Sequence, residues 1–144
     1  MKLTAQEEYG LRCLLQVARR APADDAAPLS IRDVAGSEGL SIDYTAKLMR
    51  VLRQGDLVSS ARGVTGGYRL ARPAENLRLT EVFAVLGSPL YGGGQLCETH
   101  AGQHDSCVHL TQCTLKALWG QVEDAVHQVL DGVVLADLLG AERQ

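Results

Sequence analysis

The sequence predicts a mostly α-helical α+β fold, in which short helices and a small β-hairpin precede one long helix. Three features predict this fold. Helix-start signals repeat in the first third of the chain, a glycine-rich turn joins two short strand-like segments, and an apolar stripe at helical spacing lies near the C-terminus. One Phe, one Trp and four Tyr leave a core built mainly from Leu, Val and Ala. Such a core favours helices over a large sheet.

Three helices are expected within the first 55 residues. Thr4 and Glu7 form a capping box, which pairs free backbone N–H groups of a first turn, and this helix is expected to end near Arg20. Ser30 and Ser41 are candidate N-caps of two shorter helices. Two short helices separated by a few residues that include glycine are typical of a helix-turn-helix. The inner face of the third helix is expected to carry Tyr44, Leu48, Val51 and Leu52.

A β-hairpin is expected directly after the third helix. Residues 57–60 and 68–70 have the composition of short strands, and the segment 61–67 between them contains three glycines. A hairpin in this place makes the motif a winged helix. We therefore assign residues 1–78 to a winged helix-turn-helix domain. The alternative is a chance helix–hairpin arrangement in a small α+β domain.

Residues 79–144 are expected to hold a loop and a long helix for dimerisation. Thr80 is the expected cap of a short helix that Gly87 ends, and the long helix is expected from Thr114 to about Gly132. Little chain remains to cover its apolar stripe, so we expect a second copy of the chain to pack there. The alternative is packing on the first helix of the same chain. The stripe consists of Leu115, Leu118, Trp119, Val122, Val126 and Val129.

The charge distribution favours a nucleic-acid partner for one part of the chain. The net charge is −3, yet residues 44–72 hold six basic residues against one acidic residue, a local excess of +5. A local basic stripe attracts phosphates even when the whole chain is acidic. The alternative is an ordinary solvated face. The basic residues are Lys47, Arg50, Arg53, Arg62, Arg69 and Arg72.

Three cysteines follow in a glycine-rich segment, residues 88–112, and at the start of the long helix. Thiolates are soft ligands that suit iron–sulfur clusters and zinc, but Cys97, Cys107 and Cys113 lack the spacing of a zinc ribbon. Reduced thiols in a loop are the alternative. Cys13 lies within the first helix and is interpreted as a small buried apolar residue. A fourth ligand could come from His100, His104, His109 or Glu8, although Glu8 could instead pair with Arg12.

Motifs for catalysis, secretion and membrane insertion are missing from the sequence. There is no P-loop, dinucleotide-binding fingerprint or nucleophile elbow, so we expect no enzyme. The first residues are charged where a signal peptide needs an apolar stretch, and no long uncharged apolar run exists. We therefore expect a cytoplasmic protein whose cysteines are thiols or metal ligands. A thiol redox enzyme is a remote alternative, because the cysteine segment lies in the acidic half of the chain.

Six segments that follow one another along the chain form a common pattern: residues 1–4, 41–44, 52–60, 62–63, 66–68 and 113–119. Together they resemble a family of winged-helix transcription regulators that includes the iron–sulfur regulator IscR and the nitric oxide sensor NsrR. The resemblance implies a homodimer that binds double-stranded operator DNA and holds an iron–sulfur cluster on Cys97, Cys107 and Cys113. The cluster could be [2Fe–2S] or [4Fe–4S].

The resemblance also implies roles for further residues. IscR-type members carry a ligand His where this chain has Lys116, whereas the NsrR-like branch takes a carboxylate from the partner's first helix, where Glu8 stands. Ala46 replaces a Glu that shapes base preference in IscR-like proteins. The expected function is a repressor that senses redox, nitric oxide or iron–sulfur status. A DNA-binding regulator with zinc-bound or directly oxidised cysteines is the alternative. The expected DNA contacts are Ser41, Tyr44, Lys47, Arg50, Arg53, Arg62, Thr65 and Arg69.

Overall fold

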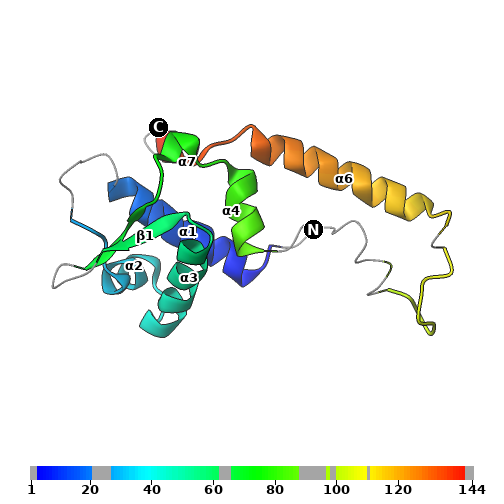
Figure 1. The fold of residues 1–144 in the computed structure, drawn as a ribbon, viewed down its shortest axis with the longest axis horizontal. Coiled ribbons are helices and arrows are strands. Elements are labelled where there is room, and N and C mark those ends of the chain that lie inside the picture. Colours follow the sequence, from blue (N-terminus) through cyan, green and yellow to red (C-terminus); the bar gives the residue numbers. More distant parts are fainter. Residues whose placement is uncertain are drawn as a thin grey trace.

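A computed structural model describes residues 3–20, 27–61, 66–87, 97, 100–109 and 111–141 of the chain. A compact body of helices carries a small β-wing at one end, and one long helix extends from the body (Figure 1). The fold is a winged helix with α+β composition, as the sequence predicts. The elements are α1 (Ala5–Arg20), α2 (Ile31–Glu38), α3 (Ile42–Gln54), β1 (Val58–Ala61), β2 (Gly67–Leu70), the 3₁₀ turn η1 (Ala74–Asn76), α4 (Leu79–Leu86), α6 (Thr114–Asp131) and α7 (Leu135–Ala141).

The predicted caps begin the first three helices. The backbone N–H of Thr4 donates to Glu7 Oε2 at 2.8 Å, and that of Glu7 donates to Thr4 Oγ1 at 3.1 Å, which closes the capping box. Ser30 Oγ accepts from the N–H of Asp33 at 3.1 Å. Gly39 ends α2 with φ 67°, a left-handed conformation that glycine adopts without steric cost. These local signals fix the start of each helix independently of the rest of the fold.

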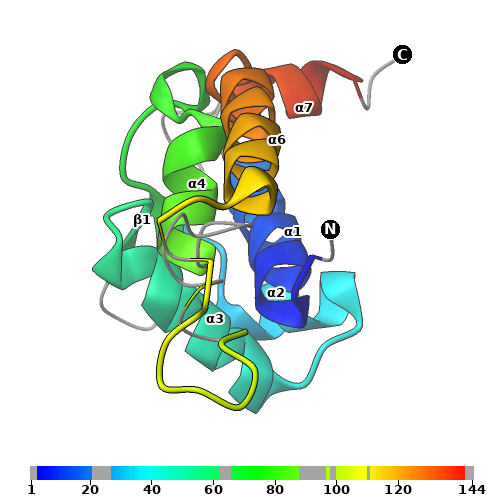
Figure 2. The same cartoon turned by 90° about the vertical axis from the view of Figure 1, so that its right-hand side faces the viewer.

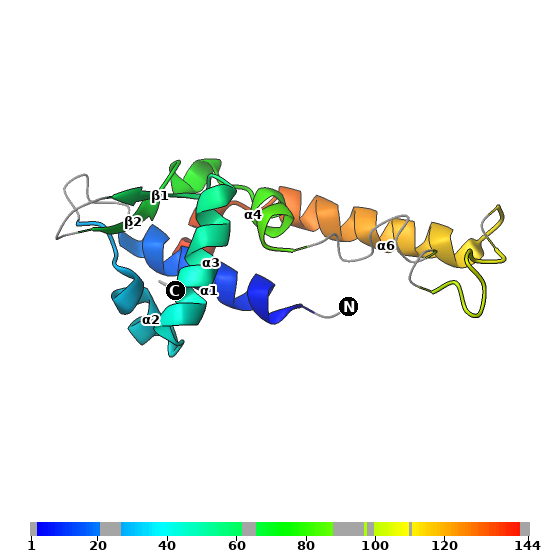
Figure 3. The same cartoon turned by 60° about the horizontal axis from the view of Figure 1, so that its bottom comes forward.

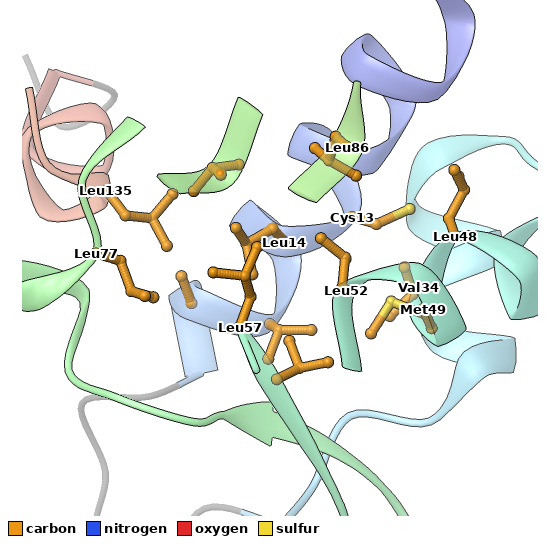
Figure 4. Close-up of a cluster of buried hydrophobic side chains, with 14 of the residues drawn as sticks. Cys13, Leu14, Val34, Leu48, Met49, Leu52, Leu57, Leu77, Leu86 and Leu135 are labelled. Atoms are coloured by element: carbon orange, nitrogen blue, oxygen red, sulfur yellow. The ribbon is translucent and has the colours of Figure 1, made fainter. Parts of the chain in front are cut away.

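The hydrophobic core lies between α1, α3 and α4 and reaches α7 (Figure 4). Leu14, Leu52, Leu86 and Leu135 are completely or almost completely buried there. Cys13 is also buried, in agreement with its interpretation as a small apolar residue.

The buried face of α3 differs in part from the predicted one. Thr45 and Met49 are buried, whereas Tyr44 and Val51 are half-buried at the edge of the core. Thr45 is tolerated in this position because its hydroxyl donates to the carbonyl of Ser41 at 2.8 Å. The buried stripe of the helix is therefore turned slightly from the one expected.

The wing is a two-stranded antiparallel sheet with Ser60 opposite Tyr68 in its register. A third segment joins its edge, because Leu29 and Tyr68 exchange two backbone hydrogen bonds of 3.0 and 2.8 Å. Gly67 allows this close approach, since a Cβ there would stand 2.5 Å from the carbonyl oxygen of Leu29. The wing is thus tied to the segment that leads into α2.

The predicted cap of α4 is wrong. Arg78 occupies the N-cap position, with no side-chain cap hydrogen bond, and Thr80 is the second helical residue. Backbone bonds explain the difference. Arg78 pairs with Val134 in an isolated antiparallel bridge, and the N–H of Leu79 donates to Val133 at 3.0 Å. The start of α4 is therefore set by a distant part of the chain.

The long helix α6 begins and ends where the sequence predicts, after Cys113 and before Gly132. All of its residues are described and none is buried. It contacts α4 near its C-terminal end and extends beyond the body (Figures 1 and 2). The segment after it, to which the sequence analysis assigns no element, forms α7 and inserts Leu135 into the core. In the described part of the chain, no helix is long and apolar enough to cross a membrane.

Candidate nucleic-acid interface and cysteine segment

The outer face of α3 is polar and basic. Lys47 and Arg50 are exposed on it, and Arg53 is exposed in the last turn. Leu48, Met49 and Leu52 hold the opposite face against the core. Figure 3 shows α3 in front of α1, with the strands of the wing on one side and α6 extending away on the other. A helix held in this way keeps one complete face exposed, which is the arrangement that recognition helices use.

Asp43 is the residue of this face that the sequence reasoning missed. It is exposed in the first turn of α3, one turn before Lys47 and two turns before Arg50. N-terminal residues of a recognition helix contact base edges, and a carboxylate there accepts hydrogen bonds from the amino group of cytosine. The helical spacing of Asp43, Lys47 and Arg50 was the signal that could have identified it.

Two expected DNA contacts have partners within the chain. Ser41 is exposed, and its Oγ accepts from the N–H of Tyr44 at 3.1 Å as the N-cap of α3. The Tyr44 ring is half-buried and meets the Tyr9 ring edge-on at a centroid distance of 6.1 Å. Both residues therefore hold the start of α3 in place, whether or not they also touch DNA.

On the wing, Arg69 is exposed and alternates with half-buried neighbours on β2. Arg62 and Thr65, the residues expected at the wing tip, lie outside the described residues. Arg72 is engaged by the protein itself, because its guanidinium donates to Glu81 Oε2 at 3.0 Å. Both side chains of that pair are well exposed, so the ion pair contributes little to stability and leaves Arg72 accessible.

The three cysteines of the predicted metal site are all free thiols and half-buried. Cys113 is the N-cap of α6, and its Sγ accepts from the backbone N–H of Lys116 at 3.3 Å. Among the described residues, which include Cys97, Cys107, Cys113 and the three loop histidines, no three possible ligands gather into a metal-binding group. The donor chemistry fits an iron–sulfur cluster, but the structure of the single chain does not bring the donors together.

Glu8 is exposed near the start of α1, and its expected partner is engaged elsewhere. Arg12 Nε donates to Glu38 Oε2 at 2.7 Å, and Gln16 donates to the other oxygen of Glu38 at 2.6 Å. The hydrogen bond that Arg12 donates to Glu38 raises the pKa of Arg12. Within one chain, the start of α1 lies well away from residues 100–109 and 111–113, as both Figure 1 and Figure 3 show.

The chain is similar to known regulators over almost its whole length. The profile of the family described as "Rrf2: Iron-dependent Transcriptional regulator" matches residues 3–141. The protein named rrf2 from Nitratidesulfovibrio vulgaris is 33% identical over 142 residues, which cover 96% of this chain and 87% of that protein.

Two solved structures share the fold. IscR of T. potens has a TM-score of 0.76 at 28% identity, and the match covers 99% of this chain and 88% of that one. CymR of B. subtilis, described as the global cysteine regulator, has a TM-score of 0.76 at 26% identity, and the match covers 98% of each chain. Sequence and fold therefore point to the same group of proteins.

Proposed function

Because this chain belongs to the Rrf2 family of transcriptional regulators, and is a DNA-binding regulator on that ground, we propose that it acts as a homodimeric repressor. In this proposal, the cysteine segment binds an iron–sulfur cluster that reports redox, nitric oxide or iron–sulfur status. The observation that carries the proposal is α6, a helix of 18 residues of which none is buried within its own chain.

The exposed apolar side chains of α6 support the homodimer. Leu115, Leu118 and Val129 keep 62%, 45% and 67% of their surface exposed. Full burial of such a side chain is worth about 1.5–3 kcal/mol, so covering the exposed part is worth about 1 kcal/mol or more for each. In a two-fold dimer each contact occurs twice, which doubles the gain. A second copy of α6 is apolar in the same positions and fits this surface.

The DNA-reading role rests on α3 and the wing. Lys47 and Arg50 would meet the major groove or its phosphates, and Arg53 and Arg69 would contact the backbone. Arg62, which the sequence predicts at the wing tip, would enter the adjacent minor groove, where its charge is favoured. Ser41 and Tyr44 would contribute at the start of α3, and Thr65 on the wing. Residues 1–78 would form this reading unit, and residues 79–144 would form the sensing and dimerising unit.

For the cluster, the proposed ligands are Cys97, Cys107 and Cys113 of one protomer and Glu8 of its partner. The separation of the start of α1 from residues 100–109 and 111–113 within one chain supports a carboxylate that comes from the second copy. A bound cluster would supply a redox-active centre that reacts with oxidants and nitric oxide. Ligands from both chains would fix how far apart the two reading units stand. Two recognition helices must reach grooves about 34–36 Å apart, so release of these ligands would weaken simultaneous binding.

A regulator with zinc-bound or directly oxidised cysteines is the second candidate. Its form with directly oxidised cysteines is favoured by one observation: the described thiols and histidines of the single chain do not converge, as a zinc site within one chain would require. Anaerobic purification separates the candidates. Visible absorbance with iron and acid-labile sulfide supports the cluster, whereas zinc without sulfide, or a metal-free protein whose DNA binding changes on oxidation, supports the alternative.

The ligand assignment is tested with Glu8→Ala. We expect a cluster with a shorter lifetime in air and unchanged folding by circular dichroism, while Glu75→Ala, which removes another exposed glutamate, behaves as wild type. An unchanged spectrum and lifetime would transfer the fourth position to His100, His104, His109 or solvent.

The dimer is tested with Leu118→Asp, for which we expect monomers in analytical ultracentrifugation and a large loss of operator affinity. Ala117→Asp is the matched control, because Ala117 is exposed on the same helix but lies outside the stripe. Equal dimerisation of the Leu118→Asp variant and wild type would remove α6 from the interface.

A further inference from the structure

The long helix is joined to the body at one end. Its described neighbour is α4, and the chain after it returns to the body through Val133, Val134 and α7. The N–H of Leu79 donates to Val133 at 3.0 Å, and the N–H of Leu135 donates to Leu77 at 2.8 Å. The direction of α6 relative to the winged helix is therefore decided at this joint, at the start of α4 and the end of α6 (Figure 1).

One carboxylate binds both sides of this joint. Arg78 Nη1 donates to Asp131 Oδ1 and Oδ2, each at 3.2 Å, and Thr80 Oγ1 donates to Oδ1 at 3.3 Å. The hydrogen bond from Arg78 lowers the pKa of Asp131, so the carboxylate is charged at neutral pH. The contact links the last residue of α6 to the N-cap and second residue of α4.

The positions of these two charges argue for a role at the joint. A helix carries partial positive charge at its N-terminus and partial negative charge at its C-terminus. Arg78 stands at the N-cap of α4 and Asp131 in the last turn of α6, so each charge lies at the unfavourable end of its own helix. Neither residue stabilises its helix alone. The favourable effect of this ion pair is therefore the link that it makes between α4 and α6.

We propose that Asp131 is a positioning residue that, through Arg78 and Thr80, sets the angle of α6 to the winged helix and thereby the spacing of the two DNA half-sites. The inference rests on the proposed dimer for its effect on DNA. The ion pair is exposed, and exposed ion pairs contribute little to stability. Its importance comes from its position at the end of α6 that is attached to the body, because a small change of angle there moves the other end of the helix. At 1.5 Å per residue α6 is about 27 Å long, so a tilt of about 5° at the joint moves its far end by roughly 2 Å.

The first test changes the charge at the joint with Asp131→Arg, which sets two cations against each other. We expect affinity for an operator with two half-sites, selected from random double-stranded DNA, to fall about tenfold, a part of the gain that linked sites provide. Affinity for a single half-site should stay at or above the wild-type value, because the substitution adds positive charge. Asp124→Arg is the matched control: it makes the same charge change at an exposed position of the same helix, away from the joint.

The charge swap Arg78→Asp with Asp131→Arg is the rescue. It restores the ion pair and places each charge at the favourable end of its helix, so we expect wild-type operator affinity and a higher melting temperature. We expect the Asp131→Arg variant to prefer operators with an altered half-site spacing, and the swap to restore the wild-type preference. A merely structural role of Asp131 would not produce this pattern. Equal loss of affinity for one and two half-sites, or no loss at all, would overturn the proposal.

The second test needs no DNA and therefore separates this inference from the proposed function. Spin labels on unnatural amino acids at Gln54 in α3 and Gln121 in α6 report the distance between the two elements within one chain, when labelled protein is diluted with unlabelled protein. We expect a narrow distribution for wild type and the swap, and a shifted or broader one for Asp131→Arg. Identical distributions in all three proteins would refute a positioning role, even if wild type binds DNA as proposed.

Discussion

Gly67→Ala offers a sharp test of how the wing is held. A Cβ at residue 67 would stand 2.5 Å from the carbonyl oxygen of Leu29, 2.6 Å from its carbonyl carbon and 3.0 Å from the N of Ser30. All three are backbone atoms, which cannot rotate away as a side chain would. We therefore expect the methyl group to separate Leu29 from the wing.

The cost follows from the contacts that this separation removes. Two backbone hydrogen bonds join Leu29 to Tyr68, and each is worth about 0.5–1.5 kcal/mol net. Leu29 is 5% exposed, and losing part of its burial removes up to about 1.5–3 kcal/mol more. We expect the free energy of unfolding to fall by about 2–4 kcal/mol in total, on these two grounds.

Urea denaturation of the metal-free protein, followed by circular dichroism, measures this change. Gly36→Ala is the matched control, because Gly36 lies in α2 with nothing within 4 Å of a Cβ. The same substitution there should raise stability by about 0.5–1 kcal/mol, since Ala is a better helix former than Gly. Wild-type stability of the Gly67→Ala variant would refute the reasoning about Leu29. Equal effects of both substitutions would refute it as well.

Two further predictions concern single residues. Burial raises the pKa of Cys13 to about 11, so its thiol stays neutral at neutral pH. Because this thiol is also buried, three cysteines of the metal-free protein should react with a thiol reagent before unfolding, and Cys13 only after it. Because the folded pKa lies above the unfolded one, this thiol stabilises the fold below about pH 9, and that contribution declines as the pH rises towards 11, which alkaline melting of wild type and Cys13→Ala would detect. Asp56 has φ 57°, where a Cβ costs about 1–2 kcal/mol, so Asp56→Gly should be more stable than Asp56→Ala by about 1 kcal/mol in urea denaturation.

The sequence was sufficient to predict the local structure wherever interactions within a short segment determine it. The capping box of Thr4 and Glu7 and the serine caps at Ser30 and Ser41 depend on residues three positions apart, so their hydrogen bonds could be read from spacing alone. The hairpin was predicted for the same reason, from its glycine-rich turn. The long helix followed from its apolar stripe.

Prediction from the sequence failed where contacts between distant segments determine the local structure. Thr80 has the composition of a cap, but the backbone bridge from Arg78 to Val134 starts α4 two residues earlier. The helix α7 is only seven residues long and is held by the burial of Leu135 between remote elements. Arg12 has Glu8 four residues before it, yet it pairs with Glu38 across the space between α1 and the end of α2. No periodicity in the chain encodes these contacts.

The proposed DNA contacts were predictable in part. Basic composition identified Lys47, Arg50 and Arg69, which are all exposed. It passed over Asp43, because an acidic residue carries the wrong sign for a search based on charge, although Asp43 shares a helical face with Lys47 and Arg50. Tyr44 was expected both in the core and at the DNA, and its half-buried ring against Tyr9 accounts for the ambiguity. To assign a side chain to the DNA-facing surface, one must know which face of the helix is exposed as well as the charge of the side chain.

The burial pattern separates the residues that keep the body folded from those that would hold two chains together in the proposed dimer. Fully buried residues come from α1, α2, α3, α4, α7 and the segments that flank the wing, while α6 contributes none. Substitutions in the apolar stripe of α6 should therefore leave the melting of the body intact and act through assembly, whereas those in the core should act on both. The joint around Asp131 belongs to neither group, because it is exposed and yet connects the two parts. For this reason its substitution should change the geometry of DNA binding while stability and assembly stay close to those of wild type.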